Sequence, residues 1–312
     1  MFDGQTPEFR VITSSLRFPE GPIAMPDGSV ILVELNGQCL SRVSPDGAIT
    51  KIADIPGAPN GAAIGPDGKC YVCNNGGVRW HRDENGLRGV GQSSDYVTGS
   101  IERVDLATGQ VERLYEGTAA GNLRSPNDIV FDREGGFWFT DRGKTRPRDM
   151  DFGGVYYAKA DGSFIAEVIH PFVSPNGIGL SADENTLYVA ETMGGRIWAF
   201  DITAPGQVRK DPWPTPNGGR YLGSSTGYRP FDSLALDSKG NICAATLADP
   251  GITIISADGR TTSFFPLPDK MTTNICFGGP DLRTAFITLS ATGRLIAMDW
   301  PYPGLPLNFL NK

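Results

Sequence analysis

A short turn recurs six times along this 312-residue chain, and its regular spacing restricts the folds that the sequence can adopt. The six turns are Asp27-Gly28, Asp67-Gly68, Glu134-Gly135, Asp183-Glu184-Asn185, Lys239-Gly240 and Asp281-Leu282. Seven residues before each turn stands a side chain that carries an oxygen, and these six residues, here called the first polar ring, are Glu20, Asn60, Asn127, Asn176, Asp232 and Asn274. A sixfold repeat of this kind is typical of a fold built from identical units around an axis.

Short apolar stretches alternate with the turns throughout the chain. Each residue of the first polar ring precedes one stretch, such as Ile129-Val130-Phe131, and each turn precedes another. Further turns predict an outer hairpin in every repeat, at Asp46-Gly47, Thr108-Gly109, Asp161-Gly162, Pro205-Gly206, Asp258-Gly259 and Thr292-Gly293. The 40 glycines and 24 prolines are spread between the stretches. The sequence therefore predicts an all-β, six-bladed β-propeller with four-stranded blades around a central channel, as a single domain over residues 1–312.

A second set of polar residues follows the first at a fixed distance. The set lies fourteen residues after the first polar ring, or fifteen in the fourth repeat, and this second polar ring is Glu34, Asn74, Asp141, Glu191, Thr246 and Thr288. The second strand of an antiparallel hairpin returns to the end at which the first began, so we expect both rings at one mouth of the channel. Residues 74–99 and 140–154 are longer than hairpins require and leave this mouth, and we expect them to cover it.

The charge balance and the cysteines argue against several classes of protein. With 28 Lys and Arg against 35 Asp and Glu, the net charge of −7 disfavours nucleic acid as a partner. Residues 1–6 lack the pattern of a secretory leader and no run of 18 apolar residues occurs, so we expect a soluble, cytoplasmic protein without a membrane partner. Cys70 and Cys73 fall on opposite faces of a predicted strand, which indicates buried thiols and not a disulfide or metal pair.

The first polar ring has the composition of a site for a divalent cation. Buried carboxylates at close range raise each other's pKa, and burial raises both further. The charges of Glu20 and Asp232 match one divalent cation, and the asparagines add neutral oxygens of the kind that calcium and magnesium prefer. No His or Cys occupies a ring position, which disfavours zinc bound through nitrogen or sulfur. The alternative is a channel filled by polar side chains and water.

Four segments around the ring resemble the signature segments of one family. They are Phe18-Pro19-Glu20-Gly21-Pro22, Ser125-Pro126-Asn127-Asp128, Ser174-Pro175-Asn176-Gly177-Ile178 and Phe231-Asp232-Ser233-Leu234-Ala235-Leu236-Asp237. They resemble the regucalcin and gluconolactonase family of six-bladed propellers, and Phe137-Trp138-Phe139-Thr140-Asp141 is similar to the bacterial gluconolactonase pattern. The resemblance covers residues 18–299. The chain departs from the pattern at Arg124, which lies three residues before Asn127 and not two, and at Arg142-Gly143-Lys144.

The resemblance implies one metal ion and a lactone substrate. It implies Glu20, Asn176 and Asp232 as metal ligands, Asn127 as a fourth ligand or substrate contact, and hydrolysis of sugar lactones with calcium, zinc, manganese or iron. Our expectation from the oxygen ligands is calcium, with magnesium, zinc, manganese or iron as alternatives. The cation would polarise the lactone carbonyl while Asp232 takes a proton from water, and Asn127 is the second catalytic candidate. A serine hydrolase is excluded, because no Gly-x-Ser-x-Gly segment occurs.

The remaining residues of the mouth are candidates for contact with substrate. The substrate-binding candidates are Asn60, Asn74, Trp80, His81, Asp141, Arg142, Glu191 and Asn274, with Tyr96, Trp138, Phe152 and Tyr228 as further pocket walls. The aromatic residues and the altered segment after Asp141 lead us to expect a substrate more apolar than an aldonolactone. The alternative function is a non-catalytic calcium-binding or ligand-binding propeller. The sequence leaves the oligomeric state open.

Overall fold

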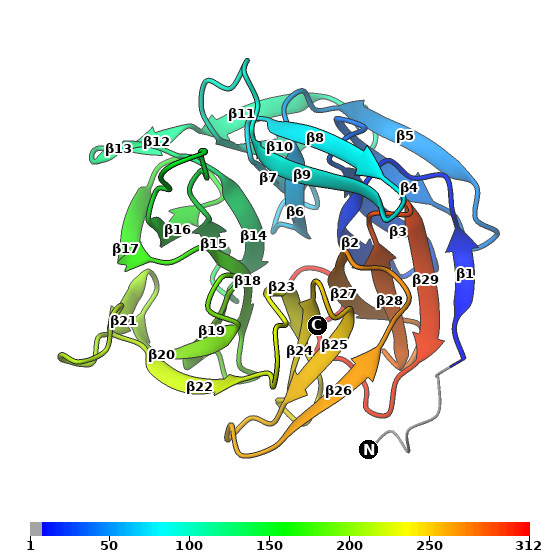
Figure 1. Ribbon diagram of the computed structural model, residues 1–312. Helices are drawn as coiled ribbons and strands as arrows, with labels where there is room; N and C mark the ends of the chain where they lie inside the picture. The colour runs from blue at the N-terminus through cyan, green and yellow to red at the C-terminus, as the bar shows by residue number, and fades with distance from the viewer. Residues whose placement is uncertain (1–7) are drawn as a thin grey trace.

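The computed structural model describes residues 8–312, and residues 1–6, from which we expect no secretory leader, lie outside the described residues. The described residues form six antiparallel sheets arranged radially around a central axis (Figure 1). The predicted all-β, six-bladed propeller is confirmed. None of the described residues belongs to a helix that could cross a membrane.

Each blade begins with an inner strand beside the axis and continues outward. The inner strands are β2 (Pro19–Ala24), β6 (Pro59–Ile64), β14 (Pro126–Phe131), β18 (Pro175–Leu180), β23 (Phe231–Leu236) and β27 (Thr272–Gly278). The second strands are β3 (Val30–Glu34), β7 (Cys70–Asn74), β15 (Gly136–Asp141), β19 (Thr186–Glu191), β24 (Ile242–Thr246) and β28 (Thr284–Leu289). Every turn predicted from the sixfold repeat joins one of these pairs, so the repeat corresponds to the blades.

The outer strands follow the prediction in five blades. They are β4 (Cys39–Val43) and β5 (Ile49–Asp54), β10 (Ser100–Val104) and β11 (Val111–Tyr115), β16 (Gly153–Lys159) and β17 (Ile165–Phe172), β20 (Arg196–Ala204) and β21 (Gln207–Arg209), and β25 (Gly251–Ile255) and β26 (Thr262–Pro266). Strand β22 (Arg220–Ser224) also pairs with β20, and β12 (Gly117–Thr118) pairs with β13 (Gly121–Asn122).

The sixth blade differs from the prediction. The turn Thr292-Gly293 joins β28 to the third strand, β29 (Arg294–Asp299), and is not part of an outer hairpin. The outermost strand of this blade is β1 (Arg10–Thr13), which pairs antiparallel with β29. A strand from the start of the chain therefore completes the last blade, and backbone hydrogen bonds close the ring.

The inner strands share a distortion at the first polar ring. The register between each inner strand and its neighbour shifts at or directly beside the ring residue, as between Glu20 and Ile23 or between Pro175 and Ile178. Such bulges redirect a side chain and interrupt the ladder. Gly21 has φ +52°, and a Cβ there would lie 2.6 Å from the carbonyl oxygen of Asn60 in the next blade. Only glycine permits the blades to approach so closely here.

Apolar side chains fill the space between neighbouring blades. Ile23, Ile31 and Val33 of the first blade form one buried cluster with Ile64 and Val72 of the second. All five cysteines are buried and unpaired, and Cys70 and Cys73 have no exposed surface. The prediction of buried thiols is confirmed, and the blades are held together by the burial of such surface.

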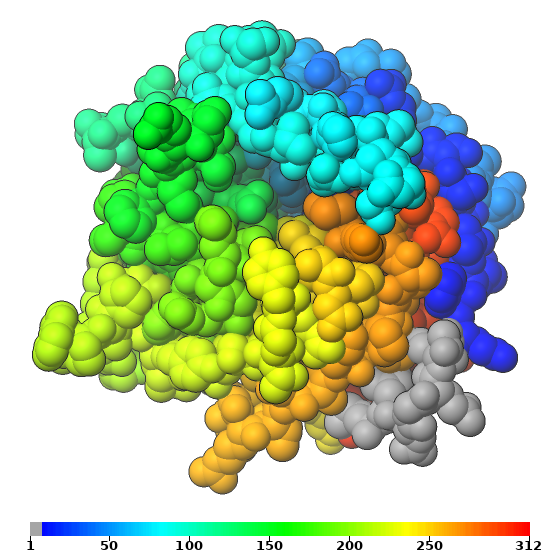
Figure 2. Space-filling model, in the orientation of Figure 1, coloured from blue at the N-terminus to red at the C-terminus, as the bar shows by residue number. Residues whose placement is uncertain are grey.

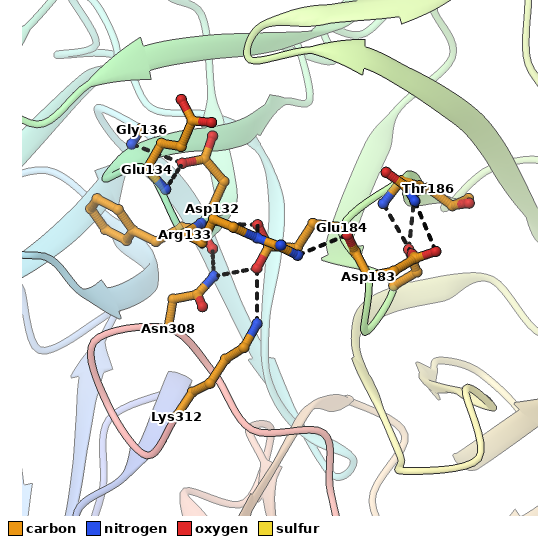
Figure 3. Close-up of polar contacts among 12 residues, drawn as sticks. Asp132, Arg133, Glu134, Gly136, Asp183, Glu184, Thr186, Asn308 and Lys312 are labelled. Carbon is orange, nitrogen blue, oxygen red and sulfur yellow. Dashed lines mark hydrogen bonds and ion pairs between the residues drawn. The ribbon is translucent and has the colours of Figure 1, made fainter.

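The end of the chain covers the end of the channel away from the mouth. A cavity of 310 Å³ lies between the inner strands and the segment Leu305–Lys312. Glu184, in the turn between β18 and β19, accepts hydrogen bonds from Asn308 Nδ2 (2.9 Å), Lys312 Nζ (3.0 Å) and the backbone of Arg133 (2.9 Å), as Figure 3 shows. Burial raises the pKa of Glu184, but these donors outweigh it and lower the pKa to about 2. The carboxylate thus anchors the segment while ionised.

The first insertion forms a hairpin of its own on the mouth face. Strands β8 (Val78–Asp83) and β9 (Gly86–Gln92) cross the first blade, shown in cyan over dark blue in Figure 2. The hairpin reaches the sixth blade, where the amide of Leu87 donates to the carbonyl of Ala291 at 3.0 Å. The second insertion runs between Asp141 and Gly153 and lies beside it, because residues of both line one groove: Arg79, Val90, Gly91, Gln92, Ser93, Thr145, Arg146 and Pro147.

Candidate active site at the channel mouth

The first polar ring lies on the inner strands at the mouth. All six side chains are buried, with exposed fractions between 2% for Glu20 and 8% for Asp232. Contacts between blades involve several of them: Asn274 Nδ2 donates to Glu20 Oε2 at 2.8 Å, and Ser233 Oγ, beside Asp232, donates to Asn176 Oδ1 at 3.5 Å. The predicted spacing of seven residues therefore corresponds to one layer of oxygen-bearing groups around the axis.

Two carboxylates in this layer are in electrostatic conflict. Burial and the neighbouring charge of Asp232 raise the pKa of Glu20 well above its ordinary value, although hydrogen bonds from Asn274 and the Gly21 amide oppose the shift. Burial raises the pKa of Asp232 to about 6, while the charge of Arg142 and a hydrogen bond from Asn176 lower it. Two buried negative charges with so little compensation are the arrangement that a divalent cation relieves.

A carboxamide in the same layer lacks a partner. Asn127 Oδ1 is buried and makes no hydrogen bond to any described residue. An orphaned acceptor of this kind costs about 1–3 kcal/mol unless something binds it. No cluster of three or more His, Cys, Asp or Glu suited to a metal occurs within residues 8–312. The donor set of the first polar ring is of another kind, since it combines two carboxylates with two carboxamides. The donors Glu20, Asn127, Asn176 and Asp232 are all oxygens, and they fit a hard cation.

The second polar ring lies at the same end of the blades, as predicted. Unlike Asn127 of the first ring, its carboxylates and its carboxamide accept hydrogen bonds from nearby backbone and side-chain groups. In the first blade Glu34 lies opposite Pro19 and accepts the backbone amide of Arg17 at 2.7 Å and the Ser41 hydroxyl at 2.6 Å. Asn74 Oδ1 accepts the amides of Ala58 and Gly76, each at 2.9 Å. These side chains stabilise the chain that enters their own blade.

Three substrate-binding candidates belong to this satisfied group. Asn74 Nδ2 donates to the carbonyl of Pro56 at 2.8 Å and also to Glu102, so the whole carboxamide is occupied. Asp141 accepts three backbone amides, those of Arg124 (2.6 Å), Ser125 (2.7 Å) and Gly143 (3.0 Å). Glu191 Oε2 accepts the indole of Trp198 at 2.5 Å. Their polar atoms serve the scaffold, and contact of these three residues with a substrate stays a prediction.

Other predicted contacts lie at the first polar ring. The carboxamide of Asn60 makes no hydrogen bond within residues 8–312, although the residue is buried. Arg142 Nε donates to Ser174 Oγ at 2.8 Å, and the guanidinium influences Asp232. Asn274 Nδ2 donates to Glu20, and Asn274 Oδ1 accepts the amide of Ile275, at 2.8 Å each. Asn60 and Arg142 are therefore the polar candidates with capacity left for a substrate.

The aromatic candidates separate into core and rim. Trp138 is buried and packs on Tyr157 with ring centroids 4.9 Å apart, so it is a core residue and not a wall of the mouth. Trp80 packs on Phe18 at 4.9 Å. His81 lies beside it on β8, with its side chain 51% exposed and Nε2 3.6 Å from Asp83. Phe152 and Tyr228 are exposed in loops that begin or end at the mouth.

Sequence reasoning missed two buried charged residues near the ring. Asp128 follows Asn127, accepts the amides of Ile129 (2.9 Å) and Ile178 (3.4 Å), and burial raises its pKa to about 7. The pair Asn127-Asp128 was the only signal for it. Lys144 is buried in the second insertion, where a lysine in a polar loop is indistinguishable in sequence from a solvated one.

The fold and this site define a class: a six-bladed propeller with buried oxygen ligands in one layer at the mouth of its channel. Residues 18–291 match the family described as SMP-30/gluconolactonase/LRE-like region, and the chain belongs to this family.

Relatives of the chain cover most of its length. It is 25% identical over 315 residues to a gluconolactonase of Zymomonas mobilis, covering 93% of this chain and 81% of that protein. It is 26% identical over 316 residues to the diisopropyl-fluorophosphatase of the squid Loligo vulgaris, covering 96% and 94%. The fold is similar to that of an Agrobacterium tumefaciens regucalcin, with a TM-score of 0.74 at 18% identity and 98% of both chains covered.

Proposed function

We propose that this protein hydrolyses a small lactone with the help of one divalent cation held by Glu20, Asn127, Asn176 and Asp232. The observation that carries the proposal is the orphaned Asn127 oxygen in the same layer as two buried, mutually repelling carboxylates. Relatives named gluconolactonase and lactonase drp35 support the reaction class, the latter from Staphylococcus saprophyticus at 28% identity over 78% of this chain and 68% of that protein. Calcium suits the all-oxygen donor set best.

The chain's own residues suit the chemical steps. A bound divalent cation would act as a Lewis acid on the lactone carbonyl. Asp232 takes the proton as water adds to this carbonyl carbon, and the positive charge of a bound cation would keep this carboxyl ionised and able to accept the proton. When the ring C–O bond breaks, the same proton returns to the leaving alkoxide, which gives a hydroxy acid. Arg142, fixed by Ser174, favours the ionised form of Asp232.

We propose further that the substrate carries fewer hydroxyl groups than an aldonolactone. A sugar lactone needs several fixed donors and acceptors, because each unpaired polar group in a closed site costs about 1–3 kcal/mol. Asn74, Asp141 and Glu191 are occupied by the scaffold, which leaves Asn60 and Arg142 as the available polar side chains. Trp80 and the exposed Phe152 and Tyr228 add apolar surface at the rim.

The test is acid release from a panel of γ- and δ-lactones by chelated protein and by protein reloaded with calcium, magnesium, manganese or zinc. We expect no turnover without metal and restored turnover with at least one cation. Metal binding without turnover of any lactone would instead indicate a non-catalytic, cation-binding propeller. The substrate proposal fails if glucono-δ-lactone exceeds an unsubstituted aliphatic lactone in kcat/KM by about ten-fold, which is about 1.4 kcal/mol in transition-state binding.

A further inference from the structure

The second insertion contains a cation that is almost completely buried. Lys144 is 5% exposed, and it is the only buried lysine or arginine among residues 8–312. Its Nζ donates to the carbonyls of Asn75 (2.7 Å) and Gly77 (3.1 Å) and to Asn75 Oδ1. It also lies 4.3 Å from the centroid of the Tyr96 ring. No carboxylate within the described part of the chain forms an ion pair with it.

These contacts join the two mouth insertions. Asn75, Gly77 and Tyr96 come from the two ends of the first insertion, which spans residues 74–99, whereas Lys144 belongs to the second. A single ammonium group therefore fixes the base of the β8–β9 hairpin to the segment that carries Arg142. Apart from Lys144, the insertions meet along the groove between Arg79, Gly91 and Thr145.

The same contacts extend to the strand that carries Asn127. Asn75 Nδ2 donates to Ser125 Oγ at 2.5 Å, and the hydroxyl of Tyr96 donates to the carbonyl of Arg124 at 2.8 Å. Residues 124 and 125 lead directly into β14, whose second residue is Asn127. Lys144 is thus connected to the start of this inner strand through a single residue, since Asn75 contacts both Lys144 and Ser125.

A lysine in this position lowers the stability of the fold, because its ammonium group is removed from water. Burial lowers the pKa of Lys144 to about 7, with a contribution from Arg142, and the carboxylates of Asp141 and Asp151 only partly oppose it. An apolar side chain of the same length would avoid the cost of desolvating the ammonium group. What the ammonium group provides instead is three directed hydrogen bonds and a cation–π contact, which define one relative position of the two insertions.

We propose that Lys144 is a positioning residue that locks both insertions and the start of β14 into one rigid side of the substrate site. The kinetic consequence of this inference rests on the proposed function, whereas its structural part does not. The lock holds the rim in place around a substrate and makes no contact with the cation donors, whereas Arg142 beside Asp232 is fixed separately by Ser174. Its loss should therefore weaken substrate binding more than turnover and leave cation affinity unchanged.

The experiment compares Lys144→Met with wild type and with Lys270→Met, which removes an exposed lysine elsewhere. Hydrogen exchange of residues 75–99 and 142–152 should accelerate by about ten-fold or more in Lys144→Met and remain unchanged in the control. For the best lactone, KM should rise by about five-fold or more with kcat within about two-fold, and calcium affinity should stay within about two-fold of wild type.

A second variant protects the test against misfolding. Asn75→Ala keeps the lysine but removes one of its acceptors and the link to Ser125, so it should accelerate exchange in the same two segments to a smaller extent. Unchanged exchange in both variants, or a fall in calcium affinity parallel to the kinetic loss, would overturn the proposal. If wild type hydrolyses no lactone, the proposed function fails, but the exchange measurements still decide whether Lys144 joins the insertions.

Discussion

The two polar rings of the propeller lie at the same end of the same hairpins, yet their side chains differ in how fully their donors and acceptors are hydrogen-bonded. Asn74 of the second ring makes hydrogen bonds through both its oxygen and its nitrogen. Asn127 of the first ring has a buried oxygen with no partner. Glu34 accepts hydrogen bonds from the Arg17 amide and the Ser41 hydroxyl of its own blade, whereas Glu20 has a pKa raised by burial and by Asp232. A bound cation would explain both the unpartnered oxygen of Asn127 and the two repelling carboxylates in its layer.

The largest expected effect comes from Asp232→Asn, which tests the first ring. Removing the proposed base should lower kcat/KM by about 10²- to 10⁴-fold. The thermal midpoint of the chelated protein should stay the same or rise, because one of two repelling buried charges is gone. Kinetics with saturating metal and thermal unfolding with chelator measure the two effects. If the variant keeps full activity, or if it unfolds, the first ring does not serve catalysis in the way that we propose.

The next largest effect is expected for Asn74→Ala, which tests the second ring. Removing this carboxamide leaves the buried amide of Ala58 and the half-buried amide of Gly76 without acceptors, so the free energy of unfolding should fall by about 2–4 kcal/mol. The folded fraction should keep its kcat/KM for every lactone, since the side chain serves the scaffold. Urea denaturation and kinetics on the same sample give both values. If kcat/KM falls for some lactones only and the free energy of unfolding is unchanged, Asn74 contacts the substrate and does not stabilise the fold.

Lys144 offers a smaller, pH-dependent effect that extends the comparison to the insertions. Its pKa of about 7 in the folded protein lies below its ordinary value of 10.5, so from about pH 7 to 10 the unfolded chain binds more protons. The contribution of Lys144 to stability therefore rises with pH in this window, by at most about 1.4 kcal/mol per unit. Denaturation at several pH values should show a gentler rise for Lys144→Met than for wild type. Parallel curves would contradict the lowered pKa.

The smallest effect is expected for the first insertion. Replacing Trp80 and His81 together by Ala removes the ring that packs on Phe18 and an exposed imidazole beside it. Because neither side chain belongs to the first polar ring, relative kcat/KM between lactones should change by about three- to ten-fold, more than the average rate falls. A panel of lactones of different size measures this ratio. A uniform loss across the panel would argue against a role in specificity.

The sequence by itself determined the blades and the first polar ring. Turn residues and the apolar stretches between them are local signals, and the spacing of seven residues fixes which side chain stands at the start of each inner strand. Glu20, Asn176 and Asp232 could be aligned without coordinates, because an equal offset in six identical hairpins places equal positions in one layer. The same logic placed both rings at one end.

Only the tertiary structure decided which of these groups are free and how the ring is closed. Whether Asn74 or Asn127 has partners depends on backbone atoms of other segments, which no spacing reveals. Pairing of β1 with β29 joins the two ends of the chain, and Lys144 meets Asn75 across 69 positions. Such long-range contacts arise from packing the whole ring, whereas a sequence pattern reports only the residues within one hairpin.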